Sequence, residues 1–374
     1  MKIAPLSAAV AAHNRNRPGA PIRHVLVHSG QHYDPTLSSR FFRELGIPIP
    51  DYHLEVGSGS HAYQVGMTMI GFEKVLLVER PDWVIVVGDV NATSACSITA
   101  KKHQFRVAHI EAGLRSNDWS MPEEVNRVVT DRLSDVLFTT CRFANANLAR
   151  EGVPSHKIAM VGNIMIDTLE SQRAVAALRA PEEIVRMNRP TELAKISHTP
   201  LHQNEFCVLT LHRPSNVDDL VTLTRNFELF HELSETIPIV FPIHPRTAGR
   251  FKEFGLWTRL ISSPRIIVVD PLGYLDLLAL TIAARVFLTD SGGIQEECCV
   301  IGTPCLTLRA NTERPATLVE NGGTNHLVGT DPLKVKSAFR LVLQSSCNPH
   351  RPHLWDGQTA TRILEQLLQR TDPV

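Results

Sequence analysis

Residues 288–297, Leu-Thr-Asp-Ser-Gly-Gly-Ile-Gln-Glu-Glu, have the residue types of an anion-binding site. An apolar run ends there, and a Ser-Gly-Gly triplet lets the backbone approach a ligand before a helix that is predicted to open at Ile294. The N–H groups and the positive dipole end of such a helix start attract a phosphate or a diphosphate. Glu296 and Glu297 are expected in its first turn, where a carboxylate suits the dipole or accepts hydrogen bonds from sugar hydroxyls. An ordinary capped helix without a ligand is the alternative interpretation.

Polar side chains also follow five predicted strands directly, at the place where ligands bind in open parallel sheets. A single residue of this kind is often only a helix cap, but five of them together indicate a site. They are Asp89 after residues 83–87, Glu111 after 107–110, His212 and Arg213 after 208–211, His244 after 239–241, and Asp290 after 286–288.

Three carboxylates are candidates for acid–base chemistry. Asp89 and Glu111 follow successive strands, and Glu123 lies in a helix that a proline is expected to start. Carboxylates that share a cleft cannot all ionise freely, so at least one pKa is raised, and unequal pKa values are what an acid and base pair requires. The alternative for Glu123 is an i,i+4 ion pair with Arg127, which could equally pair with Asp131.

The histidines and cysteines indicate phosphate chemistry and no metal. His212 and Arg213 supply a titratable group and a fixed cation, which suit the charge of a leaving phosphate, while His244 either supports them or is a core histidine. No His, Asp or Glu set has a recognisable metal-ligand spacing. The seven cysteines contain no Cys-x-x-Cys pair and are expected to be reduced and mostly buried.

The elements that would position these residues are short apolar runs alternating with helical stretches, as in parallel sheets covered on both faces. Ten runs suit two doubly wound, Rossmann-like sheets, so we predict an α/β fold with domains at residues 1–162 and 163–357. A closing helix within residues 358–374 has one apolar face and is expected to pack back on the first domain. The predicted strands are residues 24–28, 83–87, 107–110, 136–139, 158–161, 208–211, 239–241, 266–269, 286–288 and 305–308.

Composition narrows the class of partner. The 374 residues include 38 Lys and Arg against 38 Asp and Glu, so no net field favours nucleic acid or an anionic membrane. No apolar run approaches the roughly 20 residues of a membrane span, and the beginning of the chain lacks the apolar core of a secretory signal. We therefore expect a cytoplasmic protein with a small-molecule partner.

Taken together, the motifs resemble the non-hydrolysing UDP-N-acetylglucosamine 2-epimerases, which have a glycosyltransferase-B-like fold of two parallel sheets facing across a cleft. The resemblance covers nearly the whole chain. It rests on the motifs SGQHY at residues 29–33, GSGSH at 57–61, VGD at 87–89, HIEAGLR at 109–115, MPEEVNR at 121–127, GN at 162–163, LHRP at 211–214, PIHP at 242–245, TDSGGIQEE at 289–297 and TERP at 312–315.

This resemblance implies inversion at C2 of a UDP-linked sugar, by anti elimination of UDP to a 2-acetamidoglucal and return of UDP after protonation of the opposite face. It implies no nicotinamide or metal cofactor and a homodimer. Carried over by motif, Asp89, Glu111 and Glu123 are similar to the acid–base carboxylates, and His212 to a residue beside the departing diphosphate.

The resemblance also implies contacts to the UDP-sugar. The diphosphate would be held by Ser291, Gly292 and Gly293, the ribose by Glu297, and an adjoining anionic group by Arg314. Tyr274 would border the uracil, with a surface aromatic residue as the alternative. Further substrate contacts are expected from Arg115, Arg213, Gln31, Gln64 and His244, of which Arg213, Gln31 and Gln64 are positional candidates for activation by substrate.

The chain departs from the family pattern at its beginning, Met-Lys-Ile-Ala-Pro, where relatives have a first strand and a phosphate-side loop. Lys2 stands where the family has a functional lysine, and we expect it on a free terminus instead of a supported helix. Loss of a central strand would leave its neighbours in the sheet unpaired. Ser215 also stands where many relatives carry Glu.

Four functions are compatible with these motifs. The first is interconversion of UDP-N-acetylglucosamine and UDP-N-acetylmannosamine, and the second is the related hydrolysing reaction, which releases free N-acetylmannosamine. A glycosyltransferase of the same fold would not need three converging carboxylates. A nucleotide-sugar-binding remnant without turnover would follow if the missing loop were essential.

Overall fold

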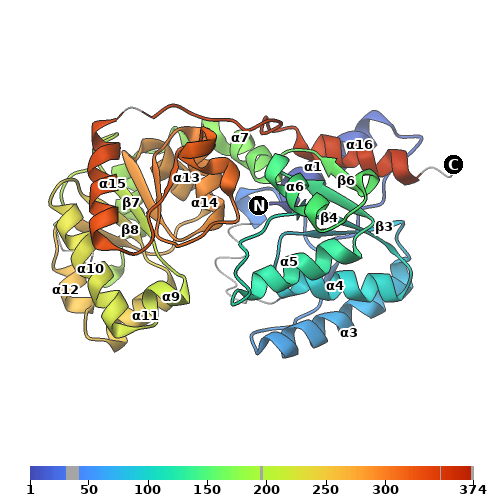
Figure 1. The fold of residues 1–374 in the computed structure, drawn as a ribbon, viewed down its shortest axis with the longest axis horizontal. Helices are drawn as coiled ribbons and strands as arrows, with labels where there is room; N and C mark the ends of the chain where they lie inside the picture. The colour runs from blue at the N-terminus through green and yellow to red at the C-terminus, as the bar shows by residue number, and fades with distance from the viewer. Residues whose placement is uncertain (31–41, 194–196, 346, 372–374) are drawn as a thin grey trace. The chain divides into compact units, whose positions relative to one another are not determined.

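A computed structural model of the chain describes residues 1–30, 42–193, 197–345 and 347–371. The chain divides into two compact units (Figure 1). Unit 1 consists of Met1–Thr168 together with Pro352–Val374, and unit 2 is Leu169–Arg351. The expected boundary followed Gly162, whereas these units divide after Thr168, inside helix α7 (Ile164–Ala176).

Unit 1 is built on parallel strands. One sheet has the order β3-β4-β5-β6, and β1 pairs with β2 in a separate two-stranded ladder. The strands are β1 (Val27–His28), β2 (Tyr52–His53), β3 (Trp83–Val87), β4 (Arg106–Ala112), β5 (Val136–Thr139) and β6 (Ile158–Met160). The helices are α1 (Ile3–Asn16), α3 (His61–Glu79), α4 (Asn91–Lys102), α5 (Pro122–Leu133), α6 (Arg142–Arg150), the short η1 (Ser155–Lys157) and α16 (Thr359–Thr371).

Helices cover both faces of the four-stranded sheet, which is why its strands read as continuous apolar runs. On one face, Leu6 of α1 and Ile363 of α16 pack with Ile110 of β4. On the other face, Phe72 of α3 packs with Val107 of β4. Figure 1 shows α1 beside α16, and α3, α4 and α5 in succession.

Unit 2 contains one six-stranded parallel sheet of order β12-β11-β10-β7-β8-β9. Its strands are β7 (Cys207–Thr210), β8 (Ile239–Pro242), β9 (Ile266–Val269), β10 (Val286–Thr289), β11 (Cys305–Thr307) and β12 (Asn325–Leu327). Its helices are α8 (Pro181–Asn188), α9 (Pro214–Val217), α10 (Leu220–Ser234), α11 (Pro245–Glu253), α12 (Trp257–Ile261), α13 (Tyr274–Ala283), α14 (Gly292–Ile301) and α15 (Pro332–Gln344), with short turns η2 (Thr191–Leu193), η3 (Pro315–Thr317) and η4 (Val319–Asn321).

The predicted α/β class with two parallel, Rossmann-like sheets is confirmed. Each of the ten predicted strand ranges overlaps a strand, whereas β2 and β12 were not predicted. Because parallel strands share the direction of their carboxyl ends, the residues that follow β3 and β4 lie at one edge of their sheet, and those that follow β7, β8 and β10 at one edge of the other.

Candidate active site

Glu111 lies at an irregularity at the end of β4. The pairing of β4 with β5 shifts between Ile110 and Ala112, and Glu111 has a φ of 72°, in the left-handed region. Such a conformation costs a non-glycine residue about 1 kcal/mol or more, so the surrounding structure must hold it in place. Its buried Oε2 atom accepts a hydrogen bond of 2.6 Å from Nζ of Lys2.

Lys2 directly precedes α1, whose Leu6 and Val10 side chains are buried. The expectation that Lys2 lies on an unsupported terminus is therefore wrong. The apolar side of α1 anchors the segment in the core of unit 1, and its lysine reaches Glu111 as a result.

Asp89 is held by Arg127 and by the loop that follows β3. Arg127 pairs with Asp89 through Nη1, and its Nε and Nη2 donate to Oε2 of Glu124 at 3.0 and 2.6 Å. These partners replace the ion pairs expected with Glu123 or Asp131. The Asn126 amide fixes the same loop by donating to the Asp89 carbonyl at 3.0 Å.

Glu124 shares Arg127 with Asp89, and the sequence analysis did not single it out. It directly follows Glu123, which is half-buried. Its carboxylate accepts hydrogen bonds from the N–H groups of Ser116 and Asn117 at 3.1 and 2.9 Å. Burial acts to raise the pKa of Glu124, but these donors and Arg127 outweigh burial and lower it. Glu124 is therefore ionised and fixes the start of α5.

Two further residues expected to contact substrate have protein partners in unit 1. Arg115 donates to both carboxylate oxygens of Glu151 at 2.7 Å and to the Leu114 carbonyl at 2.8 Å, which gives it a structural role. Gln64 accepts from Asn91 at 2.8 Å beside the Asp89 loop. Gln31 lies outside the described residues.

His212 follows β7 in unit 2 and is oriented by the buried Asp290. Its Nδ1 lies 2.8 Å from Oδ1 of Asp290, which also accepts from the backbone N–H groups of His212 and Arg213 at 3.0 and 2.8 Å. Burial acts to raise the pKa of Asp290, but His212 and the other donors lower it below its usual range. Asp290 is thus an acceptor, His212 carries a proton on Nδ1, and Nε2 is the nitrogen that can exchange a proton with a ligand.

His244 lies next to His212, with their ring centroids 5.9 Å apart. It caps α11, because its Nδ1 accepts from the N–H of Arg246 at 3.2 Å. Burial, His212 and Arg246 lower its pKa, so His244 is neutral at pH 7. His244 therefore caps a helix beside His212 and is not a core histidine.

The expected anion site is the start of α14, and it begins earlier than predicted. Ser291 is the N-cap and Gly292 the first helical residue, in place of Ile294. The N–H of Ser291 donates to Oγ1 of Thr289 at 3.0 Å, so the amides of the first turn begin at Gly292. A Cβ atom at Gly292 would lie 2.5 Å from Oε1 of Glu313, so a larger residue there would displace this carboxylate or the start of the helix.

Because α14 begins at Gly292, Glu296 and Glu297 lie in its second turn and not in the first. Both are buried, and Oε1 of Glu296 lies 3.3 Å from Nε of Arg314. Burial raises the pKa of Glu297 to about 7, although a hydrogen bond from Tyr274 acts in the opposite direction. Tyr274 is only 3% exposed, so the alternative of a surface aromatic residue is wrong.

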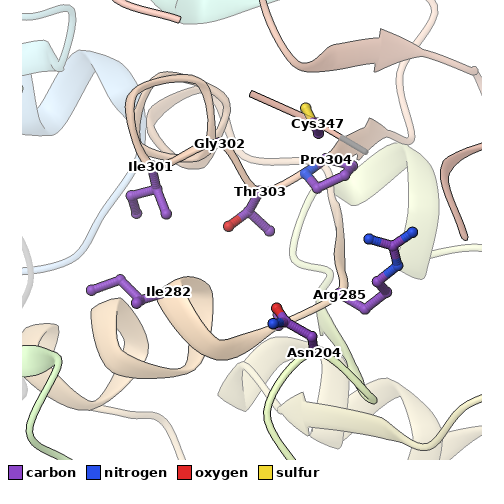
Figure 2. A pocket seen from close by; sticks show the side chains of 9 residues that line it. Asn204, Ile282, Arg285, Ile301, Gly302, Thr303, Pro304 and Cys347 are labelled. Carbon is purple, nitrogen blue, oxygen red and sulfur yellow. The ribbon is translucent and has the colours of Figure 1, made fainter. Parts of the chain in front are cut away.

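A pocket of about 500 Å³ lies elsewhere on unit 2 (Figure 2). Its lining includes Asn204, Arg285 and Pro304, which precede β7, β10 and β11. These are the amino ends of the strands, whereas His212 and Asp290 follow the carboxyl ends. No residue expected to bind or convert substrate lines this pocket.

Within the described ranges, no three His, Cys, Asp or Glu side chains are grouped so that they could hold a metal ion. All seven cysteines lie within these ranges and are free thiols. Of the helices described, none is long and apolar enough to cross a membrane.

Comparison with known proteins gives one consistent family. A sequence model of the UDP-N-acetylglucosamine 2-epimerases matches residues 15–368. UDP-N-acetylglucosamine 2-epimerase of Methanocaldococcus jannaschii is 40% identical over 344 residues, which are 91% of this chain and 90% of the relative. UDP-2,3-diacetamido-2,3-dideoxy-D-glucuronate 2-epimerase of Pseudomonas aeruginosa is 38% identical over 348 residues, 92% and 90% of the two chains.

A similar solved structure is the M. jannaschii UDP-GlcNAc 2-epimerase in complex with UDP-GlcNAc and UDP. It aligns with a TM-score of 0.85 over 98% of this chain and 96% of that chain. The resemblance carried by the sequence motifs is confirmed by these matches.

Proposed function

Because the chain belongs to the UDP-N-acetylglucosamine 2-epimerase family and is an epimerase, we propose that it interconverts UDP-N-acetylglucosamine and UDP-N-acetylmannosamine. The reaction removes the C2 proton while the bond from C1 to the UDP oxygen breaks, which gives 2-acetamidoglucal and UDP. A proton then returns to C2 on the opposite face, and UDP adds back to C1. The sugar gains and loses one proton, so no oxidant or reductant is consumed.

In this proposal the carboxylates of unit 1 transfer the protons. Asp89, Glu111 and Glu123 are the acid–base candidates, and the first two each have a cationic partner. Nζ of Lys2 donates to Glu111 at 2.6 Å, and Arg127 pairs with Asp89. An ionised carboxylate can accept the C2 proton and also stabilise positive charge on the sugar ring.

The polar groups of unit 2 bind the nucleotide and its departing diphosphate. The amides at the start of α14 and the His212 ring stabilise the negative charge that develops as UDP leaves. Ser291, Gly292, Gly293 and Arg314 are assigned to the phosphates, Glu297 to the ribose, and Tyr274 to the border of the uracil. Arg213 and His244 are assigned to the same region, next to His212.

One structural observation supports the proposed epimerase reaction in addition to the family match. Asp89 and Glu111 follow β3 and β4, which are paired neighbours in one parallel sheet, and each has a cationic partner inside unit 1. A glycosyltransferase would not require two such carboxylates at adjacent strand ends. Arg115 is withdrawn from the proposed substrate contacts, because Glu151 and the Leu114 carbonyl already bind its guanidinium.

The test is proton NMR of the purified protein with UDP-N-acetylglucosamine in D2O. We expect UDP-N-acetylmannosamine to accumulate, with deuterium at C2 of both UDP-sugars. Free N-acetylmannosamine with UDP would identify the hydrolysing reaction. Turnover of a UDP-2,3-diacetamido sugar, but not of UDP-N-acetylglucosamine, would show that the proposed substrate is wrong. UDP binding without turnover of either sugar would identify a nucleotide-sugar-binding remnant.

The proposal includes a homodimer, a cytoplasmic location and a supply of precursors for polysaccharide synthesis. The last two rest on the resemblance alone. The dimer has support in α3, where Tyr63, Met67, Ile70 and Leu77 form an exposed apolar face at helical spacing, here called the α3 face. A second copy of the chain is the occupant that we assign to it.

A further inference from the structure

The imidazole of His109 is buried beside the middle of β4 and faces two acceptors. Its Nδ1 lies 2.6 Å from Oδ1 of Asp131, and its Nε2 lies 2.8 Å from the carbonyl oxygen of Gly88. A carbonyl oxygen cannot donate a hydrogen bond, and neither can an ionised carboxylate. Both ring nitrogens therefore face acceptors, an arrangement in which only the imidazolium form of a histidine can donate to both.

The state of Asp131 agrees with this assignment. Its Oδ2 atom accepts from the N–H of Gly113 at 3.0 Å and lies 2.7 Å from Nη1 of Arg115. Burial acts to raise the pKa of Asp131, but His109 and Arg115 together lower it. Asp131 is thus an ionised carboxylate between His109 and Arg115, and burial of its charge is balanced by hydrogen bonds at both oxygens.

The same carboxylate spans the turn that contains Glu111. One oxygen binds His109, two residues before Glu111, and the other binds the N–H of Gly113, two residues after it. Gly113 has a φ of 78°, and a Cβ atom there would lie 2.5 Å from the carbonyl oxygen of Ala144, so the turn is closely packed from the other side. The left-handed conformation of Glu111 is enclosed between these fixed points.

Nε2 of His109 contacts the residue that follows the neighbouring strand β3. His109 holds the carbonyl of Gly88, whose own N–H donates to the Ile110 carbonyl at 3.0 Å. Gly88 directly precedes Asp89. One side chain therefore fixes the backbone beside Asp89 and the backbone beside Glu111.

We propose that His109 is a positioning residue whose imidazolium form, clamped by Asp131, sets the relative placement of the Asp89 and Glu111 backbones. The inference rests on the proposed function only in taking these two carboxylates as the acid–base groups. His109 itself touches no substrate. Its effect is on the geometry of proton transfer, where a displacement of about 1 Å can lower the rate by on the order of 100-fold.

The first test needs neither a variant nor activity. A neutron crystal structure of the wild-type protein, grown at pH 8 and exchanged into D2O, is expected to show deuterium on both Nδ1 and Nε2 of His109. His244, with its lowered pKa, is the internal control and should show deuterium on one nitrogen only. Deuterium on only one nitrogen of His109 would overturn the proposal, whatever the enzyme's substrate proves to be.

The second test is the His109→Gln variant, which removes the cation and one of the two donors. We expect kcat for UDP-N-acetylglucosamine to fall by on the order of 100-fold with KM changed by less than about threefold, because ground-state binding is unaffected. Its crystal structure should show Glu111 outside the left-handed region or Gly88 displaced.

The matched control is Ser134→Ala, which removes a buried hydrogen bond of 2.8 Å to Thr130 at the far end of α5. It should lower stability while kcat is retained. Wild-type kcat in His109→Gln, or a crystal structure in which neither the Glu111 backbone nor Gly88 has moved, would reject the positioning role. If the wild-type protein does not convert UDP-N-acetylglucosamine, the proposed function fails, while the neutron and crystal structures still decide the inference.

Discussion

Buried carboxyl groups in this protein differ in charge according to the donors around them. Glu124, Asp131 and Asp290 each accept several hydrogen bonds, and each has a lowered pKa in spite of burial. Glu297 is buried as deeply, but burial dominates there and raises its pKa to about 7. The first three are fixed anions that hold the backbone, whereas Glu297 changes its charge near neutral pH.

Glu297 should therefore make stability depend on pH. Its pKa rises from 4.5 to about 7 on folding, so below pH 4.5 it is protonated in both states. Between these values only the unfolded chain loses the proton, and stability falls as pH rises. The loss is about 1.4 kcal/mol for each pH unit between these two pKa values. The free energy of unfolding of Glu297→Gln, relative to that of the wild type, should therefore be about 3 kcal/mol more favourable at pH 8 than at pH 4.5.

Urea unfolding of both proteins at pH 5 and pH 8 measures this difference. The exposed Glu205 is a suitable control, because its replacement by Gln should leave the wild-type pH profile unchanged. Parallel profiles for Glu297→Gln and the wild type would show that Glu297 is ionised throughout.

The second prediction at this scale concerns Asp290. In Asp290→Asn, an amide NH2 group replaces one carboxylate oxygen. When this group faces Nδ1 of His212, two hydrogen-bond donors lie opposite each other, so Nδ1 must lose its proton to accept a hydrogen bond. We expect kcat to fall by on the order of 100-fold or more because the ring takes the wrong tautomer. Steady-state kinetics with UDP-N-acetylglucosamine measures the loss. Asp218→Asn, which removes an ion pair with Arg246 and Arg250, should retain kcat and exclude a general effect of lost charge.

Among the elements, α14 depends on glycine at its first position. In Gly292→Ala the new methyl group would meet Oε1 of Glu313, and Arg309 holds the other oxygen of this carboxylate at 2.8 Å. Either this carboxylate or the start of the helix must then shift, so we expect the affinity for UDP to weaken about tenfold, equivalent to about 1.4 kcal/mol.

Isothermal titration with UDP checks this prediction. Gly249→Ala is the matched control, since Gly249 lies in α11 with no atom within 4 Å of the added Cβ. It should bind UDP normally and gain helix stability of up to about 1 kcal/mol. Equal affinities in the two variants would argue against an anion site at α14.

The sequence predicted the strands better than it predicted the contacts between side chains. Ten apolar runs correspond to strands, and most of these strands are buried on both faces, which gives a continuous apolar sequence. β2 and β12 have two and three residues and contain polar side chains, so they lack this signal. The helix start at Gly292 was missed because a Gly-Gly pair in sequence is typical of a loop.

At the site, strand ends identified Asp89, Glu111 and His212, but not what holds them. The partner of Arg127 depends on which carboxylates the fold brings near it, and Glu124 competes with Glu123 from the adjacent position. The contact of Lys2 with Glu111 joins residues 109 positions apart. The left-handed backbone of Glu111 has no sequence signal, because glycine would be the expected residue at such a φ.

At the scale of the whole molecule, the α3 face predicts self-association. Its side chains are 39–57% exposed, so a charge at its centre should prevent a second copy from packing there. Light scattering after size exclusion is expected to give a dimer for the wild type and a monomer for Ile70→Glu. Leu178→Glu, at an 87% exposed position of unit 2, should remain a dimer. A dimeric Ile70→Glu would place the interface elsewhere.

Helix α16 affects how the protein is made as well as how it is held together. Asp167 accepts from the N–H groups of Thr359 and Ala360 at 3.1 and 2.7 Å, and Ile363 enters the same core as Leu6. During synthesis on the ribosome, the continuous segment of unit 2 emerges in full before this helix does. Unit 1, although most of its residues precede unit 2 in the chain, can close its core only after α16 has left the exit tunnel.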